Sequence, residues 1–332
     1  MATIKDVARH AGVAPSTVSH YFTGNAPVSD TTRARIERAV RELGYRPNAA
    51  ARSLRLAQTR SIGLIVPNIA NPFFAEIVQA VGYACQQVGY SLLLGDSSGD
   101  EGRERDLVAN MLKQYIDGLL IIHAGRAPTP RLLKEEPPIP VVYVDREVDD
   151  RASVATDNYL GGRLAARHLA GLGHRRIGIL AGDPHVKNVQ QRLAGFEQEL
   201  KAHRITVSKR HVIYGSQSFE TGRDVQLLMV GPDAPTAIFA TNDIIALGAW
   251  HKLNDMGLRI PDDVSLIGYD NIEMTQWTLP PLTTVEQDKR ELGRQSVATL
   301  VKAIRDRELV PATIHIPPRV VVRGSTAPPP QP

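Results

Sequence analysis

Hydrophobic positions in the first twelve residues recur with the period of a helix. The spacing i, i+3, i+4, i+7 puts four apolar side chains on one helical face: Ile4, Val7, Ala8 and Ala11. Thr3 and Asp6 have the spacing of a capping box, and Gly12 can adopt the left-handed conformation that ends a helix. We therefore expect an amphipathic helix that begins after Thr3 and ends at Gly12.

A second helix is expected from Pro15, because proline is favoured in the first turn of a helix. At 100° per residue its apolar residues share one face: Val18, Tyr21 and Phe22. Ser16 and His20 lie nearly opposite that face, and Thr17 lies on its flank. One side of this helix can pack in a core, while the other presents short hydrogen-bonding groups.

A third helix is expected to open at Ser29 and Asp30 and to stop at Gly44. Its apolar residues again share one face: Ile36, Ala39, Val40 and Leu43. Three short helices with only a few residues between the first two describe a helix-turn-helix unit, whose second helix enters the major groove of DNA.

Charge strengthens this interpretation. Residues 1–60 contain ten basic and four acidic residues, a net charge of +6, whereas the rest of the chain contains 29 basic and 31 acidic residues, a net charge of −2. A basic terminal module on a near-neutral body indicates nucleic-acid binding. A solvated basic arm is the alternative, and the helical patterning disfavours it.

The segment 46–60, RPNAAARSLRLAQTR, follows the third helix. Asn48 can cap a helix, and the alanines after it favour one. Residues 48–56 are fewer than the ~12–15 that an isolated helix needs, so we expect a helix there only when the segment is docked. Leu54, between two arginines, suits a wedge between base steps of the minor groove. A flexible linker is the alternative.

Three stretches of the chain resemble the LacI family of bacterial repressors, and especially its purine- and ribose-repressor branch: TIKDVARHAGVAPSTVSHYF, ELGYRPNAAARSLR and SIGLIVPNIANPFFAEI. The resemblance runs from residue 3 to about residue 324. It implies a homodimer on pseudo-palindromic double-stranded operator DNA, with recognition helices in the major groove and hinge helices in the minor groove. Ala14 and Pro15 depart from the usual family residues, which points to an operator unlike those of close relatives.

By position, the resemblance assigns base reading to Ser16, Thr17 and His20, and the minor-groove wedge to Leu54. The whole set that we expect to contact DNA is Thr3, Ser16, Thr17, His20, Ser29, Tyr45, Asn48, Ala51, Leu54 and Arg55.

From Ser61 onward, apolar runs alternate with helical stretches. The first four runs are SIGLIVP, YSLLLGD, DGLLIIH and IPVVYVD, and after Asn158 the pattern restarts with RRIGILAG, HVIYG, PTAIFATND and DVSLIGYDN. This alternation is typical of parallel sheets that helices cover on both faces. The fold class expected is therefore an all-α helix-turn-helix domain followed by a periplasmic-binding-protein-like α/β core of two doubly wound subdomains.

The predicted boundaries follow from these patterns. We expect the helix-turn-helix domain over 1–46, the hinge over 47–58, a first subdomain over 59–157 and a second over 158–287. Residues 288–312 are assigned to the first subdomain and 313–325 to the second. The Pro-rich end, 326–332, is expected to be disordered.

In open α/β sheets, ligands bind beyond the carboxyl ends of the strands. Polar and aromatic residues gather at these strand exits or at the start of the helices that follow: Asn71, Phe73, Phe74, Asp145, Arg146, Arg192, Asn242, Asp270 and Gln287. Singly, each of these residues is more often a cap or turn former. Together they suit a neutral, hydroxyl-rich ligand, because carboxylates and amides bind vicinal hydroxyls and aromatic faces cover C–H surface.

The family resemblance also assigns sugar contacts to these nine residues, and a pentose is the first choice of effector. Two departures from ribose binders leave a purine, a hexose or another metabolite open: Gln190 replaces an arginine, and no stacking aromatic stands near Gln217 unless Phe219 reaches the site.

Other classes of function are disfavoured. The chain has no G-x-G-x-x-G after a strand and no Walker A motif. Its single cysteine, Cys85, excludes an intrachain disulfide, and no metal site or cofactor is expected. A transport-type sugar-binding protein would share the body but should carry a signal peptide instead of a basic module. We expect a cytoplasmic, effector-controlled repressor without enzymatic activity.

Overall fold

The computed structural model describes residues 2–23, 26–45, 58–123 and 138–330. These residues form two units, Met1–Thr59 and Arg60–Pro332. The hinge positions Asn48, Ala51, Leu54 and Arg55 lie outside the described residues, so their roles remain predictions.

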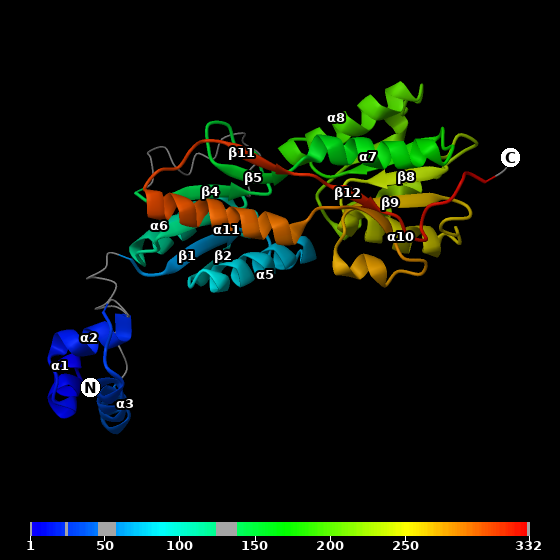
Figure 1. The fold of residues 1–332 in the computed structure, drawn as a ribbon. Helices are drawn as coiled ribbons and strands as arrows, with labels where there is room; N and C mark the ends of the chain where they lie inside the picture. Colours follow the sequence, from blue (N-terminus) through cyan, green and yellow to red (C-terminus); the bar gives the residue numbers. More distant parts are fainter. Residues whose placement is uncertain (1, 24–25, 46–57, 124–137, 331–332) are drawn as a thin grey trace. The chain divides into compact units, whose positions relative to one another are not determined.

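In the first unit, the described residues form helices α1 (Ile4–Ala11), α2 (Pro15–Thr23) and α3 (Asp30–Leu43) (Figure 1). The predicted capping box is present: Asp6 N–H donates to Thr3 Oγ1 at 3.3 Å, and Thr3 N–H donates to Asp6 Oδ2 at 2.9 Å. Gly12 and Gly44 follow their helices with φ of 61° and 57°. The core is one small cluster of buried apolar residues: Val7, Ala8, Ala11, Val18, Ile36 and Ala39.

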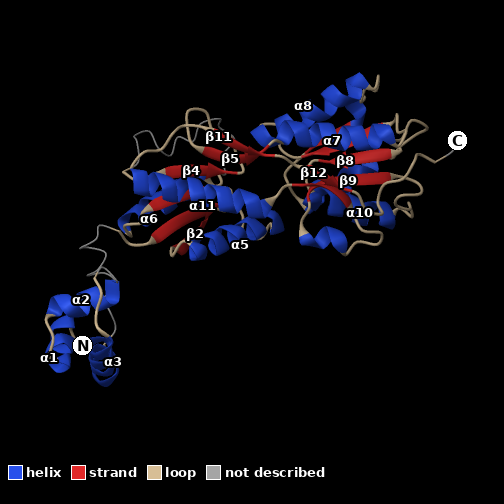
Figure 2. Ribbon diagram, viewed as in Figure 1, coloured by secondary structure: helices blue, strands red, loops and turns tan. Residues whose placement is uncertain are grey.

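The second unit contains two six-stranded sheets with helices on both faces (Figure 2). The first sheet has the order β11-β5-β4-β3-β1-β2, and all of its strand pairs are parallel. Its strands are β1 (Ser61–Val66), β2 (Ser91–Asp96), β3 (Gly118–Ile121), β4 (Val141–Val144), β5 (Ser153–Thr156) and β11 (Thr313–Ile316).

Three helices in the described part of the chain cover this first sheet: α5 (Pro72–Gln87), α6 (Glu101–Lys113) and α11 (Lys289–Asp306). Side chains of α5 and α11 share a core with Ile62, Leu64 and Val66. Residues of α6 pack with Ile65 in a separate core, because successive strand residues point to opposite faces.

The second sheet has the order β12-β10-β9-β8-β6-β7, and only β12 runs antiparallel to its neighbour. Its strands are β6 (Ile177–Ala181), β7 (Val212–Tyr214), β8 (Ala237–Ala240), β9 (Ser265–Asp270), β10 (Thr283–Glu286) and β12 (Arg319–Val321). Helices α7 (Asn158–Gly171) and α8 (Lys187–Ala202) share the core of one face. Helix α10 (Asp243–Asp255) packs in the core of the other face, and the short helix α9 (Phe219–Arg223) contacts it.

The chain crosses between the sheets after β5, after β10 and after β11. The last crossing corrects one prediction, which assigned all of 313–325 to the second subdomain. Thr313–Ile316 instead pairs with Ser153–Thr156 in the first sheet, and only β12 joins the second. A short edge strand can complete either sheet, and its pairing is decided by where the chain passes rather than by its composition.

The predicted disorder of the C-terminal end is also wrong for the part that the structure describes, 326–330. Ala327 N–H donates to Ser265 Oγ at 3.0 Å, and Ala327 O accepts from His174 Nε2 at 2.9 Å. These hydrogen bonds hold the end of the chain against the second subdomain, although its composition favours disorder. Among the described residues, no helix has both the length and the apolar character needed to cross a membrane.

Candidate functional site

Helix α2 divides into a packed side and an accessible side, as its sequence predicts. Val18 is fully buried, whereas Ser16 and His20 are exposed and Thr17 is half-buried. Tyr21 Oη donates to Glu37 Oε1 at 3.1 Å, which ties the inner side of α2 to α3. The helix is therefore fixed by its core face and leaves short polar groups available to a partner.

The other described DNA candidates stand at helix ends. Thr3 and Ser29 are the N-caps of α1 and α3, where each side chain accepts a backbone N–H hydrogen bond. Tyr45 follows α3, and its ring lies 5.9 Å from the ring of Phe22. Each of these three residues thus has a structural role that is independent of any contact with DNA.

The nine predicted effector residues divide into two groups. Asn71 and Asn242 are N-caps, and their side-chain oxygens accept from Phe73 N–H at 3.0 Å and Ile245 N–H at 2.8 Å. Phe73 is buried against Phe74, with ring centroids 5.3 Å apart. These four residues shape the N-termini of α5 and α10.

The second group is a buried charged cluster of five residues, three from the second subdomain and two, Asp145 and Arg146, from the first. Arg192 Nη1 lies 3.5 Å from Asp270 Oδ1, and Gln287 Nε2 donates to the same oxygen at 2.7 Å. Arg192 also donates to Thr241 O at 2.6 Å, and each of the side chains in the cluster is almost completely buried. Side chains from α8 and from the residue after β10 therefore converge on one carboxylate at the end of β9.

Asp145 and Arg146 follow β4 in the first subdomain, and both are buried. Asn188, from α8 of the second subdomain, donates through Nδ2 to Asp145 O at 2.7 Å and to Asp145 Oδ2 at 3.3 Å. Asn188 and Arg192 are one helical turn apart. The two carboxylates, one from each subdomain, thus meet the same face of α8.

Two buried acceptors of the cluster have no hydrogen-bond partner among the described residues: Asp145 Oδ1 and Gln287 Oε1. Buried polar atoms in native proteins are nearly always paired, because losing water without a replacement costs free energy. Unpaired acceptors inside a charged cluster are therefore suited to a ligand that brings O–H or N–H donors.

Backbone conformation also sets this site apart. Asp145 has a φ of 61°, and the consecutive residues Asp270 and Asn271 have φ of 117° and 51°. Such conformations are disfavoured for residues with a Cβ atom, and they cluster at binding sites. Both carboxylates therefore stand on strained backbone at a strand exit.

Burial raises the pKa of Asp145 to about 7, with Arg192 opposing the shift and Asp270 adding to it. Burial likewise raises the pKa of Asp270 to about 6, opposed by Arg192, Gln287 and Lys289. Buried carboxylates with raised pKa values are typical of functional sites. A donor-rich ligand would stabilise their ionised forms.

Several supporting residues were missed by the sequence analysis. Asn158 Oδ1 accepts from Arg192 Nε at 2.7 Å, and the guanidinium carbon of Arg192 lies 3.8 Å from the ring centroid of Tyr269. Asn188 could have been found from its position four residues before Arg192 on α8. Asn158 and Tyr269 carried no comparable signal, because their contacts join segments far apart in the chain.

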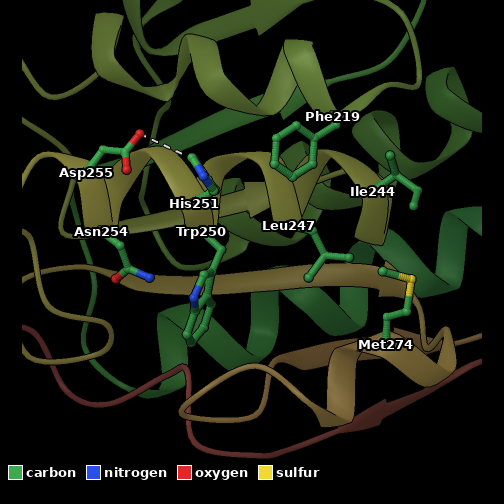
Figure 3. Close-up of a pocket in the computed structure, with 8 residues that line it drawn as sticks. All are labelled: Phe219, Ile244, Leu247, Trp250, His251, Asn254, Asp255 and Met274. Atoms are coloured by element: carbon green, nitrogen blue, oxygen red, sulfur yellow. Dashed lines mark ion pairs between the residues drawn. The ribbon is translucent and has the colours of Figure 1, made fainter.

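An apolar pocket of about 420 Å³ lies elsewhere, along α10 (Figure 3). Phe219, Leu247, Trp250 and Met274 line it, and an ion pair of His251 with Asp255 stands at its edge. The ring of Phe219 lies 5.7 Å from the His251 ring. None of the nine predicted effector residues lines this pocket, so Phe219 is directed toward a different part of the molecule.

Comparison with known proteins agrees with this architecture. Residues 3–48 match the family model for bacterial regulatory proteins of the lacI family, and residues 166–326 match a periplasmic binding protein-like domain. The HTH-type transcriptional repressor PurR of Shigella dysenteriae serotype 1 (strain Sd197) is 38% identical over 98% of this chain and 97% of its own length.

Two solved structures extend the comparison. A lac repressor dimer bound to operator and the anti-inducer ONPF is 30% identical, with a TM-score of 0.85 over 98% of this chain and 99% of the other. A LacI-family regulator from Enterococcus faecium with bound ribose is 30% identical, with a TM-score of 0.72 over 81% of this chain and 99% of the other.

The predicted fold class is confirmed by these matches, and the relatives are repressors rather than enzymes, as the sequence indicated. The chain belongs to the LacI family of bacterial regulatory proteins and is a transcriptional repressor controlled by a small molecule.

Proposed function

We propose that this repressor binds a neutral, polyhydroxylated effector, most simply a pentose, among the buried residues at the strand exits of both subdomains. The observation that carries this proposal is the pair of buried acceptors that have no partner among the described residues, Asp145 Oδ1 and Gln287 Oε1. Vicinal hydroxyls supply donors to such acceptors and can accept in return from Arg192. The nine predicted effector residues form the proposed site, with Asn188 added.

A purine effector is the second candidate, and it is favoured by the similarity to PurR repressors. Planar bases are commonly held between aromatic rings. In this chain Phe73 and Phe74 supply aromatic surface from α5, whereas Phe219 packs against His251 in another pocket. Because Phe73 and Phe74 come from the same helix and Phe219 lies in another pocket, these three rings do not hold a planar base between them. They therefore favour a sugar over a purine.

A thermal-shift screen followed by calorimetry tests the effector class. D-ribose, D-xylose, D-glucose, hypoxanthine and guanine are added separately to the full-length protein, because a ligand that binds the native state raises its melting temperature. Binding of a sugar, lost in Gln287→Ala, supports the proposal. Binding of hypoxanthine or guanine alone overturns the sugar assignment but keeps the proposed location of the site.

On the DNA side, we propose that a homodimer places α2 of each protomer in the major groove of a pseudo-palindromic operator. The basic first unit and the accessible Ser16, Thr17 and His20 support this role. Thr3, Ser29, Tyr45, Asn48, Ala51 and Arg55 are proposed as further DNA contacts, and Leu54 as the wedge between base steps. Selection from a random inverted-repeat library tests the symmetry of the operator. Sedimentation of the protein alone and on DNA tests whether it is a homodimer.

A further inference from the structure

Lys289, the first residue of α11, contacts residues of both subdomains. Its Nζ donates to Asp270 O at 2.6 Å and to Asn271 O at 2.8 Å, both at the end of β9 in the second subdomain. The same Nζ lies 3.1 Å from Glu76 Oε2 on α5 of the first subdomain. The Lys289 side chain is only 11% exposed, so these contacts are largely shielded from water.

On the second subdomain, the ammonium group meets strained backbone. Asp270 and Asn271 both have positive φ, and their carbonyl oxygens converge on Lys289 Nζ. Without a cation, two carbonyl dipoles pointing to one place repel each other. The ammonium group therefore stabilises the conformation that fixes where the Asp270 carboxylate stands.

In the first subdomain, Lys289 lies near two residues of α5, Glu76 and Phe73. Glu76 accepts from Glu273 N–H through Oε1 at 3.0 Å as well as pairing with Lys289. Phe73 stands three residues before Glu76, and Lys289 Nζ lies 6.0 Å from the centroid of its ring. The ammonium group thus lies near an aromatic residue of the proposed site from one subdomain and binds the backbone of a carboxylate from the other.

We infer that Lys289 is a positioning residue that couples the two halves of the effector site, holding the Asp270 turn and tying it through Glu76 to the helix that carries Phe73. This inference rests on the proposed function. A relative movement of the subdomains changes the Glu76–Lys289–Asp270 contacts, so effector binding and the arrangement of the subdomains are linked reciprocally. Exposed ion pairs contribute little to such coupling, but a shielded one with three acceptors contributes more.

The test compares Lys289→Met, Lys289→Arg and Glu76→Gln with a matched control, Arg294→Met. Arg294 lies on the same helix but is exposed, and it pairs with Glu291 within that helix. D-ribose affinity is measured by calorimetry. The ratio of operator affinities with and without D-ribose is measured by fluorescence anisotropy on the selected duplex, and hypoxanthine replaces D-ribose if only the purine binds.

We expect Lys289→Met to weaken effector affinity about tenfold or more, because removing a largely shielded ammonium group takes this donor away from two carbonyl groups and one carboxylate. Lys289→Arg, which keeps the charge, should restore most of the loss. Glu76→Gln should bring the operator-affinity ratio nearer to one while effector affinity changes less. Wild-type affinity and wild-type ratio in Lys289→Met would overturn the inference.

A readout without ligand separates this inference from the proposed function. Hydrogen exchange of the free protein is followed in peptides covering 270–277 and 73–80. Lys289→Met should speed exchange in both peptides, while Arg294→Met should change neither. A uniform change over the whole second unit would show a general loss of stability and contradict the coupling role, whether or not any tested compound binds.

Discussion

Arg192 Nη1 and Asp270 Oδ1 lie 3.5 Å apart, with both side chains almost completely buried. Burying two charges is costly, and a pair of this kind is weak evidence for stability on its own. Here the guanidinium also binds Thr241 O and Asn158 Oδ1, which fixes it in place. The pair is therefore better suited to present donors and acceptors to a ligand than to stabilise the fold.

Asp270→Asn should abolish the response to effector while leaving operator binding in place. The change removes the charge that faces Arg192 but keeps the size of the side chain. Since loss of one partner of a buried charged pair costs about 2–5 kcal/mol, effector affinity should fall at least thirtyfold. Calorimetry and operator anisotropy measure the two properties. Asp262→Asn, at an exposed position, serves as control, and a normal response in Asp270→Asn would remove this residue from the site.

Effector affinity should rise as pH increases from about 5 to about 7.5. The pKa values of Asp145 and Asp270 are raised to about 7 and about 6, mainly by burial, so both carboxyls gain protons in this range as pH falls. A protonated carboxyl loses part of its capacity to accept hydroxyl hydrogen bonds. Calorimetry at a series of pH values measures the effect, and Asp145→Asn should flatten the upper part of the curve.

The raised pKa of Asp145 also determines how the stability of the protein changes with pH. A carboxyl whose pKa is raised on folding binds protons more readily in the native state than in the unfolded state. The free energy of unfolding of the effector-free protein should therefore decrease as pH rises from about 4 to about 7 on account of Asp145. Urea titrations of wild type and Asp145→Asn isolate this contribution as the difference between them. A difference that does not vary with pH would show that the carboxyl of Asp145 titrates normally.

Gly162→Ala should destabilise the second subdomain and weaken effector binding together. A Cβ at Gly162 would lie 1.9 Å from Arg192 O, and a backbone atom cannot move aside without shifting α8. We expect a loss of about 1–3 kcal/mol, the usual range for overpacking. Gly171→Ala is the control on the same helix, because a Cβ there meets nothing within 4 Å. Thermal unfolding and calorimetry measure the two effects, and equal behaviour of the two variants would contradict the close packing of α7 on α8.

Local features of this fold were predictable from the sequence, and long-range pairings were not. The capping of α1 by Thr3 and Asp6 depends on residues three apart, so the sequence alone reveals it. The pairing of Thr313–Ile316 with β5 depends on a choice between two sheet edges of similar composition. The role of Lys289 could not be predicted from the sequence, because its three acceptors come from α5 and from the end of β9, far apart along the chain.

Removing residues 326–332 should lower the free energy of unfolding by about 2–4 kcal/mol, because several partly buried hydrogen bonds lose one partner each. Ala327 binds both Ser265 and His174, and Thr326 binds His168. Urea denaturation of the wild type and of the truncated protein measures the difference. Identical stabilities would restore the interpretation of this segment as a tail without structural role.

His20→Ala should reduce discrimination between operator sequences more than it reduces non-specific DNA binding. The side chain is exposed on α2, opposite the buried Val18, where a base-edge contact contributes about 1–3 kcal/mol of specificity. A phosphate contact would instead weaken binding to every sequence alike and make affinity less dependent on salt. Anisotropy titrations of the selected duplex and of a scrambled duplex, at several salt concentrations, distinguish the two roles. Because α2 is held by its buried face, His20→Ala should leave the melting temperature unchanged, so any loss of specificity reports on the contact itself.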